Sequence, residues 1–340
     1  MSTNRILVTA ANGNTGFPTA KTLLELGIPV RAFVRNADNP KALELKQLGA
    51  EIFVGDIEDI RDVRRALHGI RRAYFVPVYP NVLFQGETFA TAAEEAVLEH
   101  VVVMTQWLSS NLHPSSYTKE HWLLDHVFRR LPRVKATLLN PGLFAASYFF
   151  TMEPLAQFGM MPDFGSNAPP SNEDIGAVAA HILEDPGKHE GKTYRITGRE
   201  VLTSQEMAEI IGRVLGRKIK VRDMSEKMIM KVFKAYGYAI RDYSQLRYYI
   251  KDAQTGVFAQ GGPTDVVKNI VGREADDFET IARRYVEGHP QAGQTIFSKL
   301  RAIRNLVKAA FTRAPNLDRY EQEMAFPKFD RMALSGESED

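Results

Sequence analysis

The sequence predicts an α/β protein: a doubly wound parallel sheet followed by a smaller, mostly helical lobe. Three observations predict this fold. Over the first 140 or so residues, six short apolar runs alternate with segments of helical period, as in a parallel sheet with crossover helices. A turn that contains two glycines separates the first apolar run from the first helix. Beyond Asn140-Pro141-Gly142, strand-like runs become rare and helical segments dominate.

The expected strands are short and mostly apolar, which is typical of strands covered on both faces. In chain order they read RILVT, PVRAFV, EIFVG, AYFVPV, VVVMT and VKATLL, at residues 5–9, 29–34, 51–55, 73–78, 101–105 and 134–139. The intervening segments have helical patterns. They predict helices over residues 15–26, 40–48, 57–67, 86–98 and 117–131. Right-handed crossovers between six such strands give a doubly wound, Rossmann-type sheet.

The second half is expected to be richer in helix. Residues 192–197 (KTYRIT) form a brief strand-like piece, and residues 204–215 are amphipathic at helical period, with Gly216 as the C-terminal stop. We therefore expect three parts, namely a Rossmann domain, a smaller lobe and a C-terminal extension. They cover residues 1–142, 143–290 and 291–340.

The extension contains a second amphipathic segment. An apolar stripe recurs at steps of four and three residues, and no acid occurs between Gln294 and Asn316. The stripe consists of Ile296, Leu300, Ile303, Val307 and Ala310, with Lys299, Arg301, Arg304 and Lys308 beside or opposite it. The segment is interpreted either as a helix docked on its own domain or as a basic helix, over 296–313, that contacts an anionic membrane or a partner protein. An acidic tail, SGESED, ends the chain.

The composition excludes several classes of protein. The chain of 340 residues has no cysteine, so disulfides, thiolate zinc sites, iron–sulfur clusters and cysteine nucleophiles are excluded. Its formal charge of +2 does not indicate a nucleic-acid partner, and the eight histidines show no metal-binding spacing. No apolar run is long enough for a transmembrane helix, and no signal or transit peptide is visible. We expect a cytoplasmic protein without a metal; the oligomeric state is left open.

The turn after the first strand predicts a dinucleotide site. The sequence ILVTAANGNTG places Gly13 and Gly16 at the junction of a strand and a helix. Glycine is needed there because a pyrophosphate must approach the backbone closely, and a Cβ would hold it away. The N–H groups at the start of the following helix then face the anion.

The end of the second strand predicts the choice of cofactor. Sites for NAD carry an acid about 20 residues beyond the glycines, where it binds the ribose 2′-hydroxyl. This chain has Arg35 there instead. Arginine pairs with a 2′-phosphate through charge-assisted hydrogen bonds, so the sequence predicts NADP(H).

These motifs resemble the NmrA-like family of atypical short-chain dehydrogenase/reductases. The resemblance rests on TAANGNTG, VRAFVRN, GDIED at 55–59, NPGLF at 140–144 and the later segment DIGAVAAHILEDPGKHEGKTYRITGREVLTSQEMAEIIGRVLGRKIKV. It covers about residues 4–290. The family includes quinone and dye reductases, biosynthetic reductases and redox-sensing regulators without turnover, so it implies the fold and dinucleotide binding rather than the substrate.

The resemblance also implies positions for the cofactor. Ala10 stands where the family has the first glycine of its loop, Arg35 matches its 2′-phosphate arginine, and Asn140 stands where the family commonly has arginine. The implied cofactor contacts are Ala10, Asn12, Gly13, Asn14, Thr15 and Gly16 in the loop; Arg35; Asp56 and Ile57 beside the adenine; Val76, Pro77 and Val78 at the end of the fourth strand; and Asn140, Pro141, Gly142 and Leu143 near the nicotinamide.

The catalytic pair of the wider superfamily is only half present. That pair is Tyr-x-x-x-Lys on one helix face; here Tyr117 is followed four residues later by His121, and Lys119 lies on another face. A neutral histidine lowers the pKa of a tyrosine less than a lysine does. Two interpretations remain. In the first, Tyr117, His121 and Thr105 line the reacting site; in the second, Tyr117 is a packing residue without a catalytic role. Gln106, Trp107 and Phe144 are candidate substrate contacts.

The favoured function is an NADPH-dependent oxidoreductase that transfers hydride to a small apolar carbonyl, quinone or activated alkene. Such transfer needs alignment more than an acid, so the missing lysine does not exclude it. The alternative is an NADP(H)-binding redox sensor or assembly factor without turnover, favoured by the same missing lysine and by the basic extension. Epimerisation of a nucleotide sugar is less compatible, because that chemistry usually keeps the intact pair.

Overall fold

The computed structural model describes residues 4–337 apart from 151 and 329. Within them, seven parallel strands form the main sheet in the order β3-β2-β1-β4-β5-β6-β8, and β7 and β9 form a separate parallel pair. The strands of the main sheet are β1 (Ile6–Val8), β2 (Val30–Val34), β3 (Glu51–Val54), β4 (Arg72–Phe75), β5 (His100–Met104), β6 (Lys135–Leu139) and β8 (Thr193–Tyr194). The doubly wound α/β fold predicted from the sequence is confirmed.

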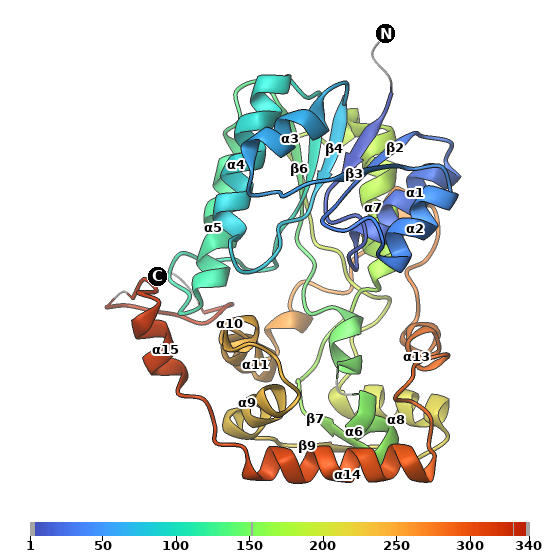
Figure 1. Cartoon of the computed structure of the whole chain (residues 1–340), viewed down its shortest axis with the longest axis vertical. Coiled ribbons are helices and arrows are strands. Elements are labelled where there is room, and N and C mark those ends of the chain that lie inside the picture. Colours follow the sequence, from blue (N-terminus) through green and yellow to red (C-terminus); the bar gives the residue numbers. More distant parts are fainter. Residues whose placement is uncertain (1–3, 151, 329, 338–340) are drawn as a thin grey trace.

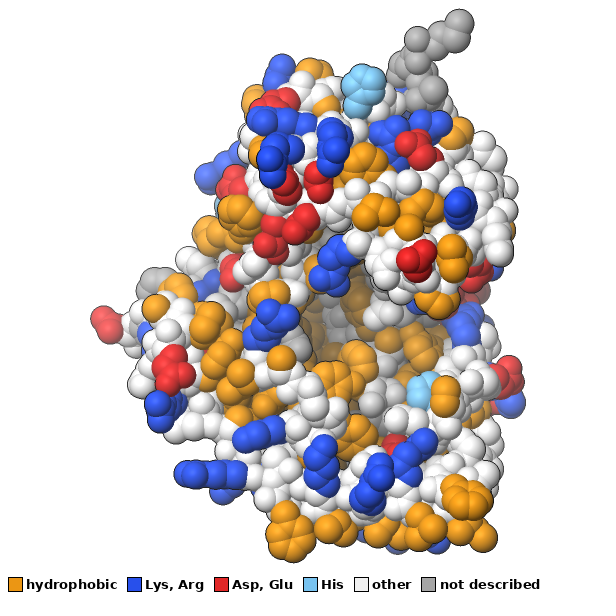
Figure 2. All heavy atoms as spheres, in the orientation of Figure 1, with side chains coloured by type: hydrophobic (Ala, Val, Ile, Leu, Met, Phe, Trp, Pro, Cys, Tyr) orange, Lys and Arg blue, Asp and Glu red, His pale blue; other side chains and the backbone are white. Residues whose placement is uncertain are grey.

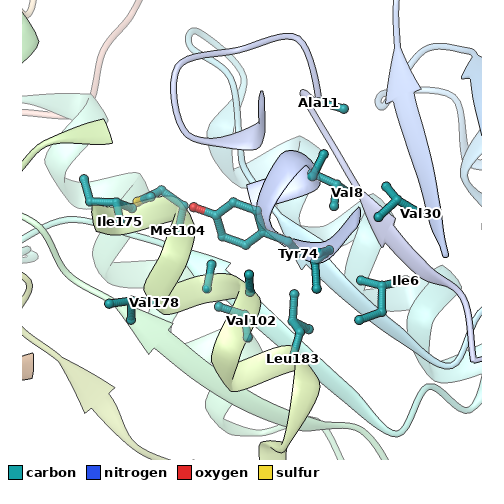
Figure 3. Packing of buried hydrophobic residues seen from close by; sticks show 14 of the residues in the cluster. Ile6, Val8, Ala11, Val30, Tyr74, Val102, Met104, Ile175, Val178 and Leu183 are labelled. Atoms are coloured by element: carbon teal, nitrogen blue, oxygen red, sulfur yellow. The ribbon is translucent and has the colours of Figure 1, made fainter. Parts of the chain in front are cut away.

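Helices cover both faces of the sheet (Figure 1). One face carries α1 (Gly16–Glu25), α2 (Pro40–Gln47) and α7 (Asn172–Glu184), and the other carries α3 (Ile60–Leu67), α4 (Val82–Ala96) and α5 (Ser116–Arg129). Tyr74 of β4 is fully buried in the first layer, and Figure 3 shows its ring directed toward Met104 and Ile175. The apolar runs are therefore buried on both sides, as their composition predicts.

Part of the second half returns to the sheet, which the sequence did not reveal. Helix α7 packs along α1 because Gly176 leaves room: an added Cβ would lie 2.8 Å from the Cβ of Pro18. The side chain of Arg72 donates to the carbonyl groups of Leu183 and Glu184 at the end of α7. Strand β8 then pairs with β6. Residues 172–194 thus belong to the sheet layers in space, although they fall within the expected lobe of 143–290.

The lobe itself packs around a third apolar core. Its elements are η1 (Ala145–Phe149), α6 (Met152–Phe158), β7 (Met160–Pro162), α8 (Ser204–Leu215), β9 (Lys220–Arg222) and α13 (Phe278–Val286). The remaining elements are η2 (Pro186–Lys188), α9 (Glu226–Ala235), α10 (Ile240–Tyr243), α11 (Leu246–Gln254), η3 (Val257–Ala259), α12 (Val266–Val271), α14 (Ile296–Phe311) and α15 (Leu317–Glu323). Helix α8 ends at Gly216 in a left-handed conformation, as predicted.

Two expected strands differ most from the structure, while the other five differ by no more than one residue at either end. The fourth ends at Phe75 instead of residue 78, because Pro77 has no N–H to donate to a neighbouring strand and a side chain from α4 binds the backbone of Val78. The strand-like piece at 192–197 pairs only over Thr193–Tyr194. No helix among residues 4–337 that the structure describes has the length and apolar character needed to cross a bilayer.

Candidate cofactor and substrate cleft

A cleft of about 510 Å³ lies at the carboxyl ends of β1, β4, β5 and β6. Figure 2 shows the molecule hollowed between its two parts, where this cleft lies. Strand order reverses between β1 and β4, and ligands of open parallel sheets bind at such a point. The cleft is lined by Ala10, Gly13, Asn14, Thr15, Val76, Pro77, Val78, Tyr79, Met104, Thr105, Gln106, Tyr117, His121, Pro141, Gly142, Leu143, Phe144, Ser147, Gln245, Leu246 and Tyr249.

The glycine turn forms one end of the cleft. Gly13 donates its N–H to the Ala10 carbonyl at 2.7 Å, and a Cβ added to Gly13 or to Gly16 would lie 2.9 Å or 2.2 Å from that carbonyl oxygen. Ala10 itself has a φ of 45°, a left-handed conformation in which glycine is the unstrained residue. The alanine therefore keeps the tight turn at a small local cost.

Helix α1 begins immediately after this turn. Its N-cap residue, Thr15, makes no side-chain hydrogen bond to the first turn. Within that turn the N–H of Phe17 donates to the Gly13 carbonyl at 3.2 Å and Pro18 has no N–H, which leaves the N–H of Gly16 without an internal cap among the described residues. The N-terminus of a helix carries partial positive charge and unpaired donors. A pyrophosphate in the cleft would satisfy them, and the turn has the close backbone approach that this group requires. The residues present fit a dinucleotide.

The backbone of residues 76–78 forms the facing wall. Thr9 Oγ1 accepts the N–H of Val76 at 2.8 Å, which ties this wall to the end of β1. Gln85 of α4 accepts the N–H of Val78 through Oε1 at 2.7 Å and donates from Nε2 to the Val78 carbonyl at 2.9 Å. Pro77 lies between them and is buried. The wall is thus held by two side chains rather than by strand pairing.

Three predicted contacts lie around the outer end, beyond the lining of the cleft. Arg35 directly follows β2 and is exposed. The N–H of Ala11, in the glycine turn, donates to the carbonyl of Phe33. Arg35 follows Phe33 by two residues, so its backbone lies near the turn. Asp56 is exposed and its Oδ1 accepts the N–H of Glu58, while Ile57 packs against the second core. This is the place expected for an adenosine 2′-phosphate and adenine.

Tyr117 and His121 meet at the inner end of the cleft, as their spacing on α5 predicts. Their ring centroids are 4.6 Å apart and nearly perpendicular. Burial lowers the pKa of His121 to about 3, so this imidazole is neutral at pH 7. Burial, then Glu120 and Tyr79, raise the pKa of Tyr117 above its ordinary value of 10.0. The tyrosine therefore keeps its proton, and among the described residues that line the cleft no cation activates it as a base.

Lys119 points elsewhere, as predicted. Its Nζ donates to the carbonyl of Pro327 in the C-terminal extension at 2.9 Å, and its side chain is buried. Thr105 lines the cleft, and its hydroxyl donates to the Leu139 carbonyl at 3.3 Å. That hydroxyl has lone pairs left to accept a hydrogen bond from a ligand.

Gln106 links the sheet to the lobe across the cleft. Its Nε2 donates to Thr118 Oγ1 at 3.1 Å, and its Oε1 accepts a short hydrogen bond from the hydroxyl of Tyr249 on α11. Burial raises the pKa of Tyr249 well above 10.0, so this phenol remains a donor. Gln245, at the start of α11, accepts from Ser115 Oγ and from the N–H of Ser116. These bonds place α11 over the inner end of the cleft.

Asn12, Gly16, Asn140 and Trp107, predicted as contacts, do not line the cleft. Asn12 and Gly16 belong to the same turn as the lining residues Ala10, Gly13 and Asn14. Asn140 is buried, and its Nδ2 donates to the Gln106 carbonyl, which joins the ends of β5 and β6. Trp107 lies outside the lining, where the Arg195 guanidinium carbon stands 4.3 Å from its ring centroid. Asn140 Oδ1 and Trp107 Nε1 have no hydrogen-bond partner among the described residues.

Six residues of the lining were missed as site residues: Tyr79, Met104, Ser147, Gln245, Leu246 and Tyr249. Tyr249 belongs to an aromatic-rich stretch that is visible in the sequence, but nothing local separates it from its neighbours in the core. Among the described residues that line the cleft there is no acid, lysine or arginine. With His121 neutral and both tyrosines protonated, the inner end carries no formal charge at pH 7.

Comparisons with known proteins agree with this geometry. The profile of the NmrA-like family matches residues 2–247. An NAD(P)H azoreductase of Xenophilus azovorans is 25% identical over 303 residues, which are 82% of this chain and 97% of the azoreductase. Among solved structures, the NADPH-dependent quinone oxidoreductase QOR2 of Escherichia coli, complexed with NADPH, has a TM-score of 0.70 at 20% identity and covers 82% of this chain and 99% of its own.

The fold is shared with a regulator as well. NmrA, a negative transcriptional regulator solved in complex with NAD, has a TM-score of 0.69 at 17% identity, over 83% of this chain and 95% of NmrA. Reductases and a regulator therefore have the same architecture. At these identities the two solved structures establish the fold, and the function must be argued from the site.

Proposed function

The chain belongs to the NmrA-like family, and from this premise and the cleft we propose that it is an NADPH-dependent oxidoreductase. Its acceptor is a small, uncharged and largely apolar carbonyl compound, quinone or activated alkene. The observation that carries the acceptor class is the lining of the cleft, which is apolar and without charged side chains among its described residues. A charged substrate placed there would lose hydration without gaining an ion pair.

The residues of the chain have separate tasks in this proposal. The glycine turn and the N-terminus of α1 hold the pyrophosphate, and Arg35 binds the 2′-phosphate. Residues 141–144 and Thr105 pack against the nicotinamide end. When bound, NADPH supplies the hydride. Tyr117 holds its proton on Oη through neutral pH, so it donates a hydrogen bond to a carbonyl or quinone oxygen rather than removing a proton.

The alternative is an NADP(H) sensor or assembly factor without turnover. The observation in its favour is the neutral His121, since no cation stands beside Tyr117 to prepare it for proton transfer. The regulator NmrA has the same fold, which makes this alternative concrete. Both proposals need the same cofactor cradle and differ only in the chemistry at the inner end of the cleft.

One experiment distinguishes them. Purified chain is titrated with NADPH by calorimetry, and oxidation of NADPH is then followed with neutral quinones, enones and aldehydes and with carboxylated analogues of each. The reductase proposal expects turnover of at least one neutral acceptor, with kcat/KM at least ~10-fold above that of its carboxylated analogue. Tight binding of NADPH without oxidation by any acceptor supports the sensor. Absence of binding refutes both.

A further inference from the structure

Helix α14 (Ile296–Phe311) is held on the lobe by one narrow face. Its two buried side chains are Ala302 and Ala309. On the same side of the helix, Arg301 Nε and Asn305 Nδ2 each donate to the carboxylate of Glu153 at 2.9 Å, and Glu153 is 1% exposed. These contacts with α6 fix the rotation of α14 about its own axis.

The opposite face of α14 is apolar and faces solvent. We call its large side chains the outer ridge. Their exposed fractions are 77% at Ile296, 83% at Phe297, 58% at Leu300, 42% at Ile303, 49% at Val307 and 87% at Phe311. Four of these six residues belong to the stripe predicted from the sequence, so the stripe faces away from the domain instead of docking on it. Figure 2 shows the hydrophobic band along the lower edge of the molecule, over the helix labelled in Figure 1.

Cations lie on both sides of the outer ridge. At the helical period, Lys299 falls on one side of it and Arg304 and Lys308 on the other, and all three are exposed. The segment from Thr295 to Leu317 contains no acid. A soluble helix exposes its polar face and buries its apolar face, and α14 has the reverse arrangement along most of its length.

The elements packed against α14 add positive charge. Lys231 and Lys234 of α9 donate to the carbonyl groups of Ala310 and Arg313 at the end of α14. Residues 217–234, which include β9 and most of α9, contain seven Lys or Arg and two Asp or Glu, whereas the whole chain has a formal charge of only +2. The end of the molecule that carries the outer ridge therefore has a local excess of positive charge.

We propose that α14 is a membrane-surface helix, which inserts the outer ridge between the headgroups of an anionic lipid surface while its flanking cations bind the lipid charges. Such helices lie in the interface plane with one apolar face and Lys or Arg beside it. Phenylalanines stand at both ends of the ridge, where they anchor the helix along its length. With 16 residues, α14 lies on the surface and does not span it.

The cations of α14 favour an anionic lipid surface over a second copy of the chain as the partner of the outer ridge. Two outer ridges packed face to face would bring Lys299, Arg304 and Lys308 of one copy against the same cations of the other, which costs free energy in a low-dielectric contact. On an anionic lipid surface, by contrast, each of these cations makes the free energy of binding more favourable. This inference rests on α14 and the elements packed against it, and it is independent of the proposed function.

The test uses the full-length protein and vesicle flotation. Vesicles of phosphatidylcholine alone are compared with vesicles in which about a third of the lipid is phosphatidylserine or phosphatidylglycerol. We expect binding only to the anionic vesicles, and at least ~10-fold weaker binding when the salt is raised from ~0.05 M to ~0.5 M. The double variant Leu300→Ser/Val307→Ser should lose binding at least ~10-fold.

Matched variants make the result specific. Leu43→Ser/Leu48→Ser removes two exposed leucines, in α2 and at its C-cap, with exposed fractions of 44% and 45%, and this variant should bind as the parent does. Arg304→Gln/Lys308→Gln should lose binding, whereas Arg130→Gln/Lys192→Gln, at exposed positions elsewhere, should retain it. Circular dichroism and NADPH binding report whether each variant is folded.

Three results would overturn the proposal. The first is no binding to any vesicle at low salt, and the second is equal binding to neutral and anionic vesicles. The third is a dimer in light scattering that Leu300→Ser/Val307→Ser converts to a monomer, because the ridge would then cover a second copy. These vesicle and light-scattering measurements do not depend on reductase activity. A negative reductase assay would therefore contradict the proposed function without affecting the membrane proposal.

Discussion

Gly16 and Ala10 approach so closely that a Cβ built on Gly16 would lie 2.2 Å from the carbonyl oxygen of Ala10. Gly16→Ala must therefore open the turn. We expect a loss of stability of about 1–3 kcal/mol and at least ~10-fold weaker NADPH binding. Calorimetry and thermal unfolding check this. Gly187→Ala is the control, since an added Cβ there has nothing within 4 Å.

At position 10 of the same turn, a substitution is expected to preserve both stability and NADPH binding. Ala10 has a φ of 45°, which costs an alanine about 1 kcal/mol relative to glycine. Ala10→Gly should thus keep NADPH affinity within about twofold and leave stability unchanged or slightly higher. If Ala10→Gly abolished binding, the alanine methyl group would have to contact the dinucleotide, and the role given to the turn would be wrong.

Arg35 is expected to determine the preference for NADPH. Its side chain is exposed at the end of β2, and charge-assisted hydrogen bonds to a phosphate are worth about 1.5–3 kcal/mol. Arg35→Gln should weaken NADPH binding by ~10- to 100-fold and change NADH binding by less than about twofold. Parallel titrations with both nucleotides measure this, with Arg130→Gln as the surface control. Equal loss for both nucleotides would place Arg35 away from the 2′-phosphate.

Tyr117 should matter to turnover but not to cofactor binding. Burial keeps its phenol protonated, so Tyr117→Phe removes a hydrogen bond to the acceptor oxygen. We expect kcat/KM for a carbonyl or quinone acceptor to fall about 10-fold, with the Kd for NADPH unchanged within about twofold. Unchanged turnover of every accepted substrate would show that Tyr117 only packs against Tyr79 and His121.

His121 gives the chain a pH-dependent stability. Burial lowers its pKa from 6.5 to about 3, so between these values the unfolded chain binds a proton that the folded chain does not. This contribution to stability is therefore nearly complete above pH 7 and is lost as the pH falls through 6.5 toward 3, by about 1.4 kcal/mol at pH 5.5. Urea unfolding at pH 8 and 5.5 should show a smaller loss for His121→Gln than for the parent. Equal losses in both proteins would contradict the buried, neutral imidazole.

Local patterns predicted the parts of the site that lie close together in the sequence. The strand–turn–helix pattern located Gly13 and Gly16, and the i, i+4 spacing brought Tyr117 and His121 to one face. The end of the fourth strand was predicted three residues too late. At Val78 the backbone hydrogen bonds are made to the side chain of Gln85 and not to a neighbouring strand. No periodicity of residues 73–78 contains that information.

Side-chain direction and long-range contacts could not be read from the sequence. Tyr249 reaches Gln106 from a helix 143 residues later, and Asn140 uses its Nδ2 to donate to the Gln106 carbonyl. The apolar stripe of α14 was visible, but the docked face is selected by the buried carboxylate of Glu153, which pairs with Arg301. A helical period defines a stripe without telling which face meets the protein.

The link between Tyr249 and Gln106 leads to the last prediction. Tyr249→Phe removes the one hydrogen bond by which α11 holds Gln106 across the cleft, as far as the described residues show, and keeps the ring that packs beside Tyr117. A lost hydrogen bond of about 1 kcal/mol should raise KM for the acceptor about fivefold.

The Kd for NADPH should stay within about twofold, because the phosphate cradle lies at the other end of the cleft. Tyr238→Phe, at a tyrosine that is 48% exposed, is the matched control and should change neither constant. Steady-state kinetics and calorimetry on the same preparations separate the two constants. A parallel loss of acceptor and NADPH affinity would mean that α11 orders the whole cleft, and the division into a cofactor end and a substrate end would then be wrong.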